Sequence, residues 1–269
     1  MAMSPLTSRF NGVRDGFGVA VLLGGVLLLY YLVPLVALFV AEPPAQVIDR
    51  LGDADVGRAA GVSLGAAGAT AGVSLLLGVP LAYALARSQH AWKRVVTALV
   101  VVPLVFPPIV SGMLLLTLFN PNSLIGGVAA AGGVPLTRSF VAVVLAQTFV
   151  ASPFVVITAK AAFEGVPRAY EYASRSLGKS RWATFWRVTI PLAWPGILAG
   201  VTLAFARAIG EFGATIMMAY YPRTLPVQIW VAFTTLGLDA AFPVALLLAA
   251  ISIAALVVLN TIGANPWTQ

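Results

Sequence analysis

Hydrophobic residues along this chain gather in six long segments that short polar connections separate. The segments cover residues 17–40, 58–86, 95–119, 139–163, 193–219 and 240–262. An α-helix needs about 20 mostly apolar residues to cross the hydrocarbon core of a bilayer, and each segment provides that length. The first segment exceeds the roughly 7–15 residues of a signal-peptide core, so we expect it to be retained. The pattern predicts an all-α membrane protein with six transmembrane helices in one domain, residues 1–269.

The composition supports a lipid environment and excludes several kinds of site. Hydrophobic residues make up 60% of the chain and charged residues 9%, whereas soluble domains carry roughly 25% charged residues. The formal net charge of +7 resides mainly in the connections between apolar segments, which argues against nucleic-acid binding. There is no cysteine and only one histidine, His90. We therefore expect no disulfide and no metal site.

The distribution of lysine and arginine predicts the orientation. With the N-terminus in the cytoplasm, eleven of these residues lie on the cytoplasmic side and four on the outer side. Because basic residues concentrate in cytoplasmic loops, this bias predicts that both termini are cytoplasmic. The expected location is the plasma or inner membrane, as a multi-pass protein.

The connection formed by residues 164–191 is longer and more patterned than the others. Pro167 suits the first turn of a helix, and Gly178 suits a left-handed cap that ends one. The pattern predicts helix, glycine turn and helix, with aromatic residues Tyr172, Trp182 and Phe185 that could pack against the bundle or a partner protein. The competing interpretations are a solvated connector and a helix lying on anionic lipid.

A nucleotide site in this connection is not expected. Gly178, Lys179 and Ser180 resemble the end of a phosphate-binding loop, but Ala173 occupies the position of the first glycine. The strand that precedes such a loop is also missing. We expect the chain to have no cofactor and no catalytic site of its own.

Prolines and glycines inside the spans predict local features of the bundle. Pro103, Pro107 and Pro108 favour either a broken third helix beside a pathway or a simple kink. Small residues let helices approach closely in lipid, and we expect tight packing at two groups of glycines: Gly61, Gly65, Gly68 and Gly72 in the second span, and Gly196 and Gly200 in the fifth. A short apolar stretch between Thr224 and Leu238 is too short to span and is expected at the outer surface or in the mouth of the pathway.

Arg207 and Glu211 are the only charged residues well inside a predicted span. Their spacing of four places them on one helix face, about one turn apart. One interpretation is a structural ion pair; the other is that Arg207 attracts an oxyanion while Glu211 holds the guanidinium. Met113 and Phe212, with Pro107 and Pro108, are candidate gate residues because they are bulky or helix-breaking near the expected pathway.

The segment 164–191 resembles the cytoplasmic EAA loop of permease subunits of ABC importers. Its matching residues are Glu171, Ala173, Leu177, Gly178, Val188, Ile190 and Pro191, with Ser174 in place of the second alanine. Residues 103–112 are similar to the third span of oxyanion permeases. Residues 205–215 resemble the fifth span of molybdate, tungstate and sulfate permeases, and residues 219–222 are most similar to molybdate/tungstate permeases.

This resemblance implies the fold of a type I ABC importer permease and a role in ATP-driven import of a tetrahedral oxyanion. Molybdate or tungstate is the expected substrate, and sulfate or thiosulfate is the alternative. The resemblance further implies a homodimer, two cytoplasmic ATPase subunits that bind ATP and magnesium, and an external substrate-binding protein. It assigns ATPase coupling to Glu164, Glu171, Ala173, Leu177, Gly178 and Pro191.

Three other functions fit the residues less well. An ion-coupled transporter usually has several intramembrane carboxylates or histidines and often inverted repeats, but here only Glu211 is available and no repeat is evident. An intramembrane enzyme would need a catalytic constellation that the chain lacks. A channel would not explain the helical and aromatic pattern of residues 164–191, because a channel needs no cytoplasmic partner there.

Overall fold

The computed structural model describes residues 7–41 and 53–263, and within these ranges it contains helices and no strand. It divides into two units, residues 1–49 and 50–269, which we describe separately. The first unit contains α1 (Thr7–Ala41), whose described side chains are almost all exposed. Its apolar part, Gly18–Leu38, is long enough to cross a membrane. This agrees with the predicted first span.

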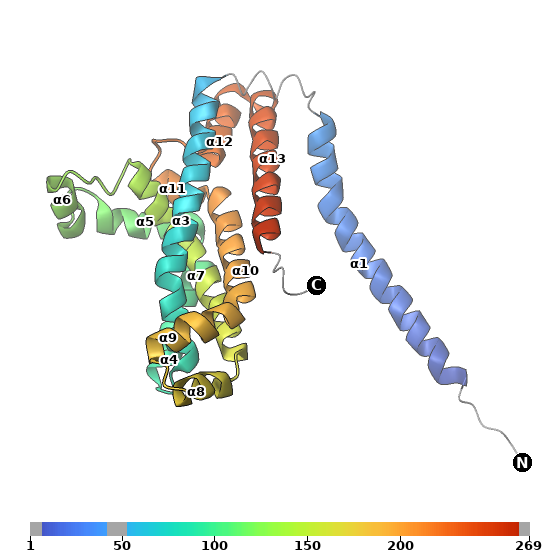
Figure 1. Cartoon of the computed structure of the whole chain (residues 1–269). Coiled ribbons are helices and arrows are strands. Elements are labelled where there is room, and N and C mark those ends of the chain that lie inside the picture. The colour runs from blue at the N-terminus through green and yellow to red at the C-terminus, as the bar shows by residue number, and fades with distance from the viewer. Residues whose placement is uncertain (1–6, 42–52, 264–269) are drawn as a thin grey trace, which may run out of the picture. The chain divides into compact units, whose positions relative to one another are not determined.

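The second unit is built around three long helices that pack side by side: α3, α7 and α10 (Figure 1). Its elements are α3 (Ala54–Arg87), α4 (Trp92–Val105), α5 (Pro108–Phe119), α6 (Leu124–Ala131), α7 (Phe140–Gly165), α8 (Arg168–Ser176), α9 (Arg181–Thr184), η1 (Phe185–Thr189), α10 (Ile190–Ile209), α11 (Gly213–Met218), α12 (Leu225–Leu236) and α13 (Leu238–Gly263). Helices α8 and α9 lie at one end of this bundle and α12 at the other (Figure 1).

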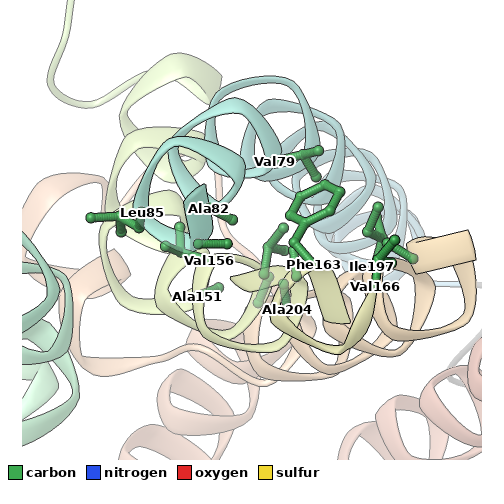
Figure 2. Close-up of a cluster of buried hydrophobic side chains, with 14 of the residues drawn as sticks. Val79, Ala82, Leu85, Ala151, Val156, Phe163, Val166, Ile197 and Ala204 are labelled. Atoms are coloured by element: carbon green, nitrogen blue, oxygen red, sulfur yellow. The ribbon is translucent and has the colours of Figure 1, made fainter. Parts of the chain in front are cut away.

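The core between the three long helices consists of small and medium-sized apolar side chains. Val79 and Leu85 from α3 lie with Phe163 from α7 and Ile197 and Ala204 from α10, all of them buried (Figure 2). Small residues on the facing surfaces bring the backbones close together, which increases dispersion contacts where lipid supplies no hydrophobic drive between helices.

Glycines allow the closest approach between α7 and α10. A Cβ atom added at Gly196 would lie 2.5 Å from the Cβ of Ala162, and one added at Gly200 would collide with Thr158. These two positions confirm the predicted tight packing in the fifth span.

The corresponding prediction for α3 is wrong within this chain. Gly61, Gly65, Gly68 and Gly72 are all exposed, and a Cβ atom added at Gly61, Gly68 or Gly72 would meet nothing within 4 Å. The packed face of α3 carries Ser63, Ala66, Thr70 and Ser74 instead. Helical spacing shows that residues share a face, but α3 has two faces of small residues, and spacing does not tell which of them packs inside.

The predicted third span is sharply broken, as one of its two interpretations required. Helix α4 ends at Val105, Phe106 is extended, and α5 begins at Pro108 in a direction that differs by 113°. Pro107 and Pro108 provide no N–H groups to continue the first helix, whereas Pro108 fits the first position of the second. Pro103 lies within α4 and does not interrupt it.

The predicted fifth span, 193–219, has both ends in the wrong place. A continuous helical segment runs over Arg181–Ile209, and the chain then turns at Gly210 into the separate helix α11. The helix starts earlier than the hydrophobic pattern predicts, because Arg181 and Arg187 give its first turns a loop-like composition. The π-helical turn η1 ends at Thr189, two residues before Pro191, whose missing N–H weakens the α-helical pattern there.

The C-terminal part agrees with the pattern of the sequence. Helix α12 has 12 residues and is too short to span. Its first residue, Leu225, is buried against α3, where its N–H donates to the Ser63 hydroxyl at 2.8 Å. Helix α13 matches the predicted sixth span.

Candidate functional site

Residues 164–191 fold as the sequence predicts, and we call them the coupling segment after the role that the resemblance implies. Helix α8 begins after Pro167 and ends at Ser176, Gly178 adopts a left-handed conformation with φ of +81°, and α9 follows. The Ser180 hydroxyl caps α9 by accepting a hydrogen bond from the Ala183 N–H at 3.1 Å. The segment therefore forms a helical corner and not an open loop.

Glu171 in this segment is bound by an arginine from a distant helix. Arg87, the last residue of α3, donates to Glu171 Oε1 through Nη2 at 2.7 Å and through Nε at 3.0 Å. The two side chains are only 15% and 13% exposed. Because both are largely withdrawn from solvent, their charges are screened weakly and each depends on the other.

Three further hydrogen bonds extend this contact to other elements. The Thr189 hydroxyl of η1 donates to Glu171 Oε1 at 3.0 Å. Arg87 Nη2 also donates to the Val166 carbonyl at the end of α7, and Arg168 Nη2 donates to the Arg87 carbonyl, both at 3.2 Å. We call Arg87, Glu171 and Thr189 the clamp, because they join α3, α8 and the start of the helical segment that becomes α10.

An aromatic cluster lies next to the clamp. The ring of Tyr83 packs against Phe163 and Phe185 at centroid distances of 5.3 and 4.7 Å, in edge-on geometry. Phe163 is fully buried in α7. Edge-to-face aromatic pairs add to the energy of burial, so α3, α7 and η1 are held together by packing as well as by charge.

The other residues predicted to couple to an ATPase occupy different settings. Glu164 accepts hydrogen bonds from Lys93 at 3.0 Å and Lys160 at 3.2 Å, so it links α4 to α7. Leu177, beside Gly178, is 82% exposed at the corner of the segment. Ala173 and Pro191 are also exposed. The two glutamates thus make contacts within the chain, while Leu177 and its neighbours face outward.

A cavity of about 1160 Å³ lies between the coupling segment, α3 and the N-terminal part of α10. Apolar residues of α3 line one part, and arginines and aromatic rings of α8, α9 and η1 line the other. Sequence reasoning did not predict this cavity or the role of Arg87. Among the described residues, no group of three or more acidic, histidine or cysteine side chains could hold a metal ion.

The predicted ion pair between Arg207 and Glu211 forms at the end of α10. Arg207 Nη2 lies 2.5 Å from Glu211 Oε2, and the Glu211 side chain is 1% exposed whereas that of Arg207 is 29% exposed. Glu211 lies beyond the last residue of α10, not on the helix face that spacing predicted. Its Oε1 accepts a hydrogen bond from the Ala214 N–H at 2.7 Å and so stabilises the start of α11.

Helix α11 packs closely on α5, which follows the break in the third span. A Cβ atom added at Gly213 would lie 2.9 Å from both Pro108 Cβ and the Ile109 nitrogen, and one at Gly112 would lie 2.8 Å from the backbone of Ala214. The two segments that resemble oxyanion permeases are therefore in direct contact.

The two bulky gate candidates lie in different surroundings. Phe212 packs against Trp230 of α12 at a centroid distance of 5.6 Å. Met113 is exposed on α5. Pro107 and Pro108 form the break itself, and Pro108 lies at the crossing with α11.

Comparison with known proteins identifies the family of this chain. Residues 74–265 match the family described as binding-protein-dependent transport system inner membrane component. The chain belongs to this family. It is 56% identical over 250 residues to a protein of Haloferax volcanii named probable molybdenum ABC transporter permease protein. The alignment covers 93% of this chain and 91% of that protein. The chain is 38% identical over 240 residues to the molybdate/tungstate transport system permease protein of Thermococcus kodakarensis, covering 88% and 92% of the two chains.

Solved structures of ABC importers share the fold of this family member. A bacterial ABC transporter for the import of the polysaccharide alginate aligns with a TM-score of 0.68 at 18% identity, covering 95% of this chain and 97% of that chain. The inward-facing methionine ABC transporter aligns with a TM-score of 0.60 at 18% identity, covering 77% and 92%. The fold is thus that of a type I ABC importer permease, as the resemblance implied.

Proposed function

We propose that this chain is the membrane subunit of an ATP-driven importer for molybdate or tungstate. The observation that carries the substrate is the 56% identity, over nearly the whole chain, to the molybdenum permease of Haloferax volcanii. The molybdate/tungstate permease of Thermococcus kodakarensis supports the same class. Sulfate, the alternative from the sequence, has no comparable support among these relatives.

We place both termini and the coupling segment in the cytoplasm, where two separate ATPase subunits bind ATP and magnesium. Leu177 and the neighbouring exposed residues fit a contact with an ATPase, because they project from the corner that the left-handed Gly178 forms. A binding protein on the opposite face delivers the oxyanion. In this scheme the chain catalyses no covalent step itself.

Within this scheme, Glu171 is a positioning residue rather than a contact for the ATPase. Its carboxylate is occupied by Arg87 and Thr189. A displacement of α8 by the ATPase is therefore passed to α3 through Arg87 and to α10 through Thr189. The clamp converts movement of a surface helix into movement of two spans.

The Arg207–Glu211 pair has a structural role in this proposal. The buried Glu211 holds both the end of α10 and the start of α11. Since α11 crosses α5 closely, the pair sets the position of the broken third helix beside the pathway. Its net neutrality also avoids a tight anion site, which would slow release of the substrate.

We further propose that two copies of the chain form the translocation pathway. The exposed glycines of α3 support this arrangement, because they leave room for a second helix to approach closely in lipid. The natural absence of cysteine makes the test direct. A single Gly68→Cys substitution should give a disulfide-linked dimer under oxidation, and a Leu99→Cys control on α4 should not.

The experiment that tests the function is uptake into proteoliposomes containing the chain, its ATPase and its binding protein. Molybdate or tungstate should enter only with ATP and the binding protein, and excess sulfate should compete weakly. Calorimetry of the binding protein with the three anions identifies the substrate independently. Failure of the chain to bind an ATPase or to change its turnover would refute the proposal.

A further inference from the structure

The cavity beside the coupling segment has an apolar part and a basic part at different depths of the bundle. Leu76 and Val79 of α3 line the apolar part, and Trp194 of α10 borders it. Arg175 of α8 and Arg181 of α9 line the other end. Within the second unit, the side chains of Leu76 and Trp194 are exposed, so the apolar part is open between α3 and α10.

The length of this cavity matches one leaflet of a bilayer. The lining of the cavity on α3 runs from Gly72 to Arg87, and a rise of about 1.5 Å per residue separates these two residues by about 22 Å. That distance is about half of the roughly 40–45 Å bilayer with its headgroup regions included. Trp182, Trp186 and Trp194 border the cavity, and tryptophan is typical of the boundary between headgroups and acyl chains.

The charge at the basic end is positive and uncompensated. Among the described residues that line the cavity, Glu171 is the only acidic one, and Arg87 neutralises it. Within residues 7–41 and 53–263, the side chains of Arg175 and Arg181 form no ion pair and no hydrogen bond. Guanidinium groups match phosphate oxygens in geometry, and basic pockets between transmembrane helices favour anionic headgroups.

We propose that this cavity binds one anionic phospholipid of the bilayer. Its phosphate lies between Arg175 and Arg181, and its acyl chains lie along Leu76, Val79 and Trp194. The lipid fills the space that the coupling segment, α3 and α10 enclose. The position of the segment that the proposed ATPase contacts therefore depends on the anionic lipid content of the membrane.

Lipid retention on the purified permease provides the test. The protein is extracted from nanodiscs containing phosphatidylcholine and phosphatidylglycerol, and the retained lipid is measured by native mass spectrometry. The expected result is one retained phosphatidylglycerol per chain and little phosphatidylcholine. The Arg175→Gln/Arg181→Gln variant should bind about 25-fold more weakly, because each guanidinium that contacts the phosphate contributes roughly fivefold.

Two matched variants make the result specific. Lys179→Gln/Arg187→Gln removes the same charge from the coupling segment, but neither residue lines the cavity, so retention should change by less than about twofold. Arg175→Lys/Arg181→Lys keeps the charge and should restore most of the binding. It also controls for misfolding of the glutamine variant.

Several outcomes would overturn the proposal. Equal retention of phosphatidylcholine would remove the headgroup selectivity, and an equal loss in the Lys179/Arg187 variant would reduce the effect to general surface charge. Displacement of the lipid by inorganic phosphate at millimolar concentration would indicate a soluble anion instead. Absence of retained lipid in an intact dimer would indicate that a second copy fills the cavity. Because the permease is tested alone, none of these outcomes depends on the proposed transport function.

Discussion

The ion pair between Arg87 and Glu171 gives the sharpest test of how the coupling segment is held. We consider the variants Arg87→Gln and Glu171→Gln, alone and combined. Each single change leaves the other charge without a partner in a site where both side chains are about 85% buried. Removing one member of a buried ion pair typically costs about 3–5 kcal/mol. We expect about 3 kcal/mol for each single variant, because the site keeps some access to water.

The double variant should recover much of this loss. It contains two neutral amides that can bond to each other, to Thr189 and to the Val166 carbonyl, so no charge is left unpaired. The coupling energy between the two positions should be about 4 kcal/mol, which leaves the double variant only about 2 kcal/mol less stable than the wild type and lies within the range for close charge pairs. Thermal unfolding in detergent measures it, since about 1 kcal/mol shifts the midpoint of a chain near this size by roughly 2–4 °C.

The exposed pair Asp55–Arg58 on α3 is a matched control for this cycle. Its atoms are 2.6 Å apart, close to the 2.7 Å of the clamp, but its side chains are 76% and 63% exposed. The same cycle there should give a coupling energy below about 1 kcal/mol. If the clamp variants are additive, or if they lower the midpoint no more than the control, the contact does not hold the segment and the reasoning is refuted.

A transport measurement separates positioning from stability. In proteoliposomes the double variant should still hydrolyse ATP in the presence of the binding protein but import less oxyanion per ATP than the wild type. The exchange Arg87→Glu/Glu171→Arg should restore part of the import. A double variant that regains stability and also transports normally would show that the clamp serves folding alone.

Three further predictions concern other positions. Gly213→Ala should destabilise the protein by about 1–3 kcal/mol, because the added Cβ would overlap Pro108 and Ile109. The control Gly165→Ala, where the added Cβ meets nothing within 4 Å, should keep the unfolding midpoint within about 2 °C of the wild-type value. Gly178→Ala forces an L-residue to φ of +81°, so it should cost about 1–2 kcal/mol and weaken co-purification with the ATPase. Glu211→Gln should lower the unfolding midpoint more than Arg207→Gln does, since Glu211 is buried and holds α11 while Arg207 reaches solvent; equal effects would contradict the proposed structural role of the pair.

The features that the sequence predicted well depend on local chemistry. Gly178 and Pro167 determine the shape of the coupling segment through their own backbone preferences, and Pro107 and Pro108 break the third span for the same reason. Each of these residues acts on its immediate neighbours. Their effects can therefore be inferred without knowing what packs against them.

The features that the sequence did not predict depend on partners far along the chain. Arg87 and Glu171 are separated by 84 positions, so nothing in either neighbourhood indicates their contact. The exposed glycines of α3 show a second reason why sequence prediction fails. Small residues at helical spacing are compatible with a face that packs inside the bundle and with a face that lies on its surface. The start of α10 shows a third reason: charged residues mark a helix that extends beyond the membrane as readily as they mark a loop.

One continuous helical segment connects the two candidate sites. It runs from Arg181 to Ile209, with the Thr189 contact of the clamp near its beginning and the Arg207–Glu211 pair at its end. Between these points, Gly196 and Gly200 let the segment approach α7 closely. Because close packing there resists separation of the two helices, the segment is expected to pivot about this contact and not to bend. A small displacement at Thr189 would then move the opposite end, where Glu211 attaches α11 and α11 contacts the broken third helix. This helical segment thus joins the proposed ATPase contact to the proposed pathway. The Glu171 carboxylate holds it at one end and the Glu211 carboxylate at the other.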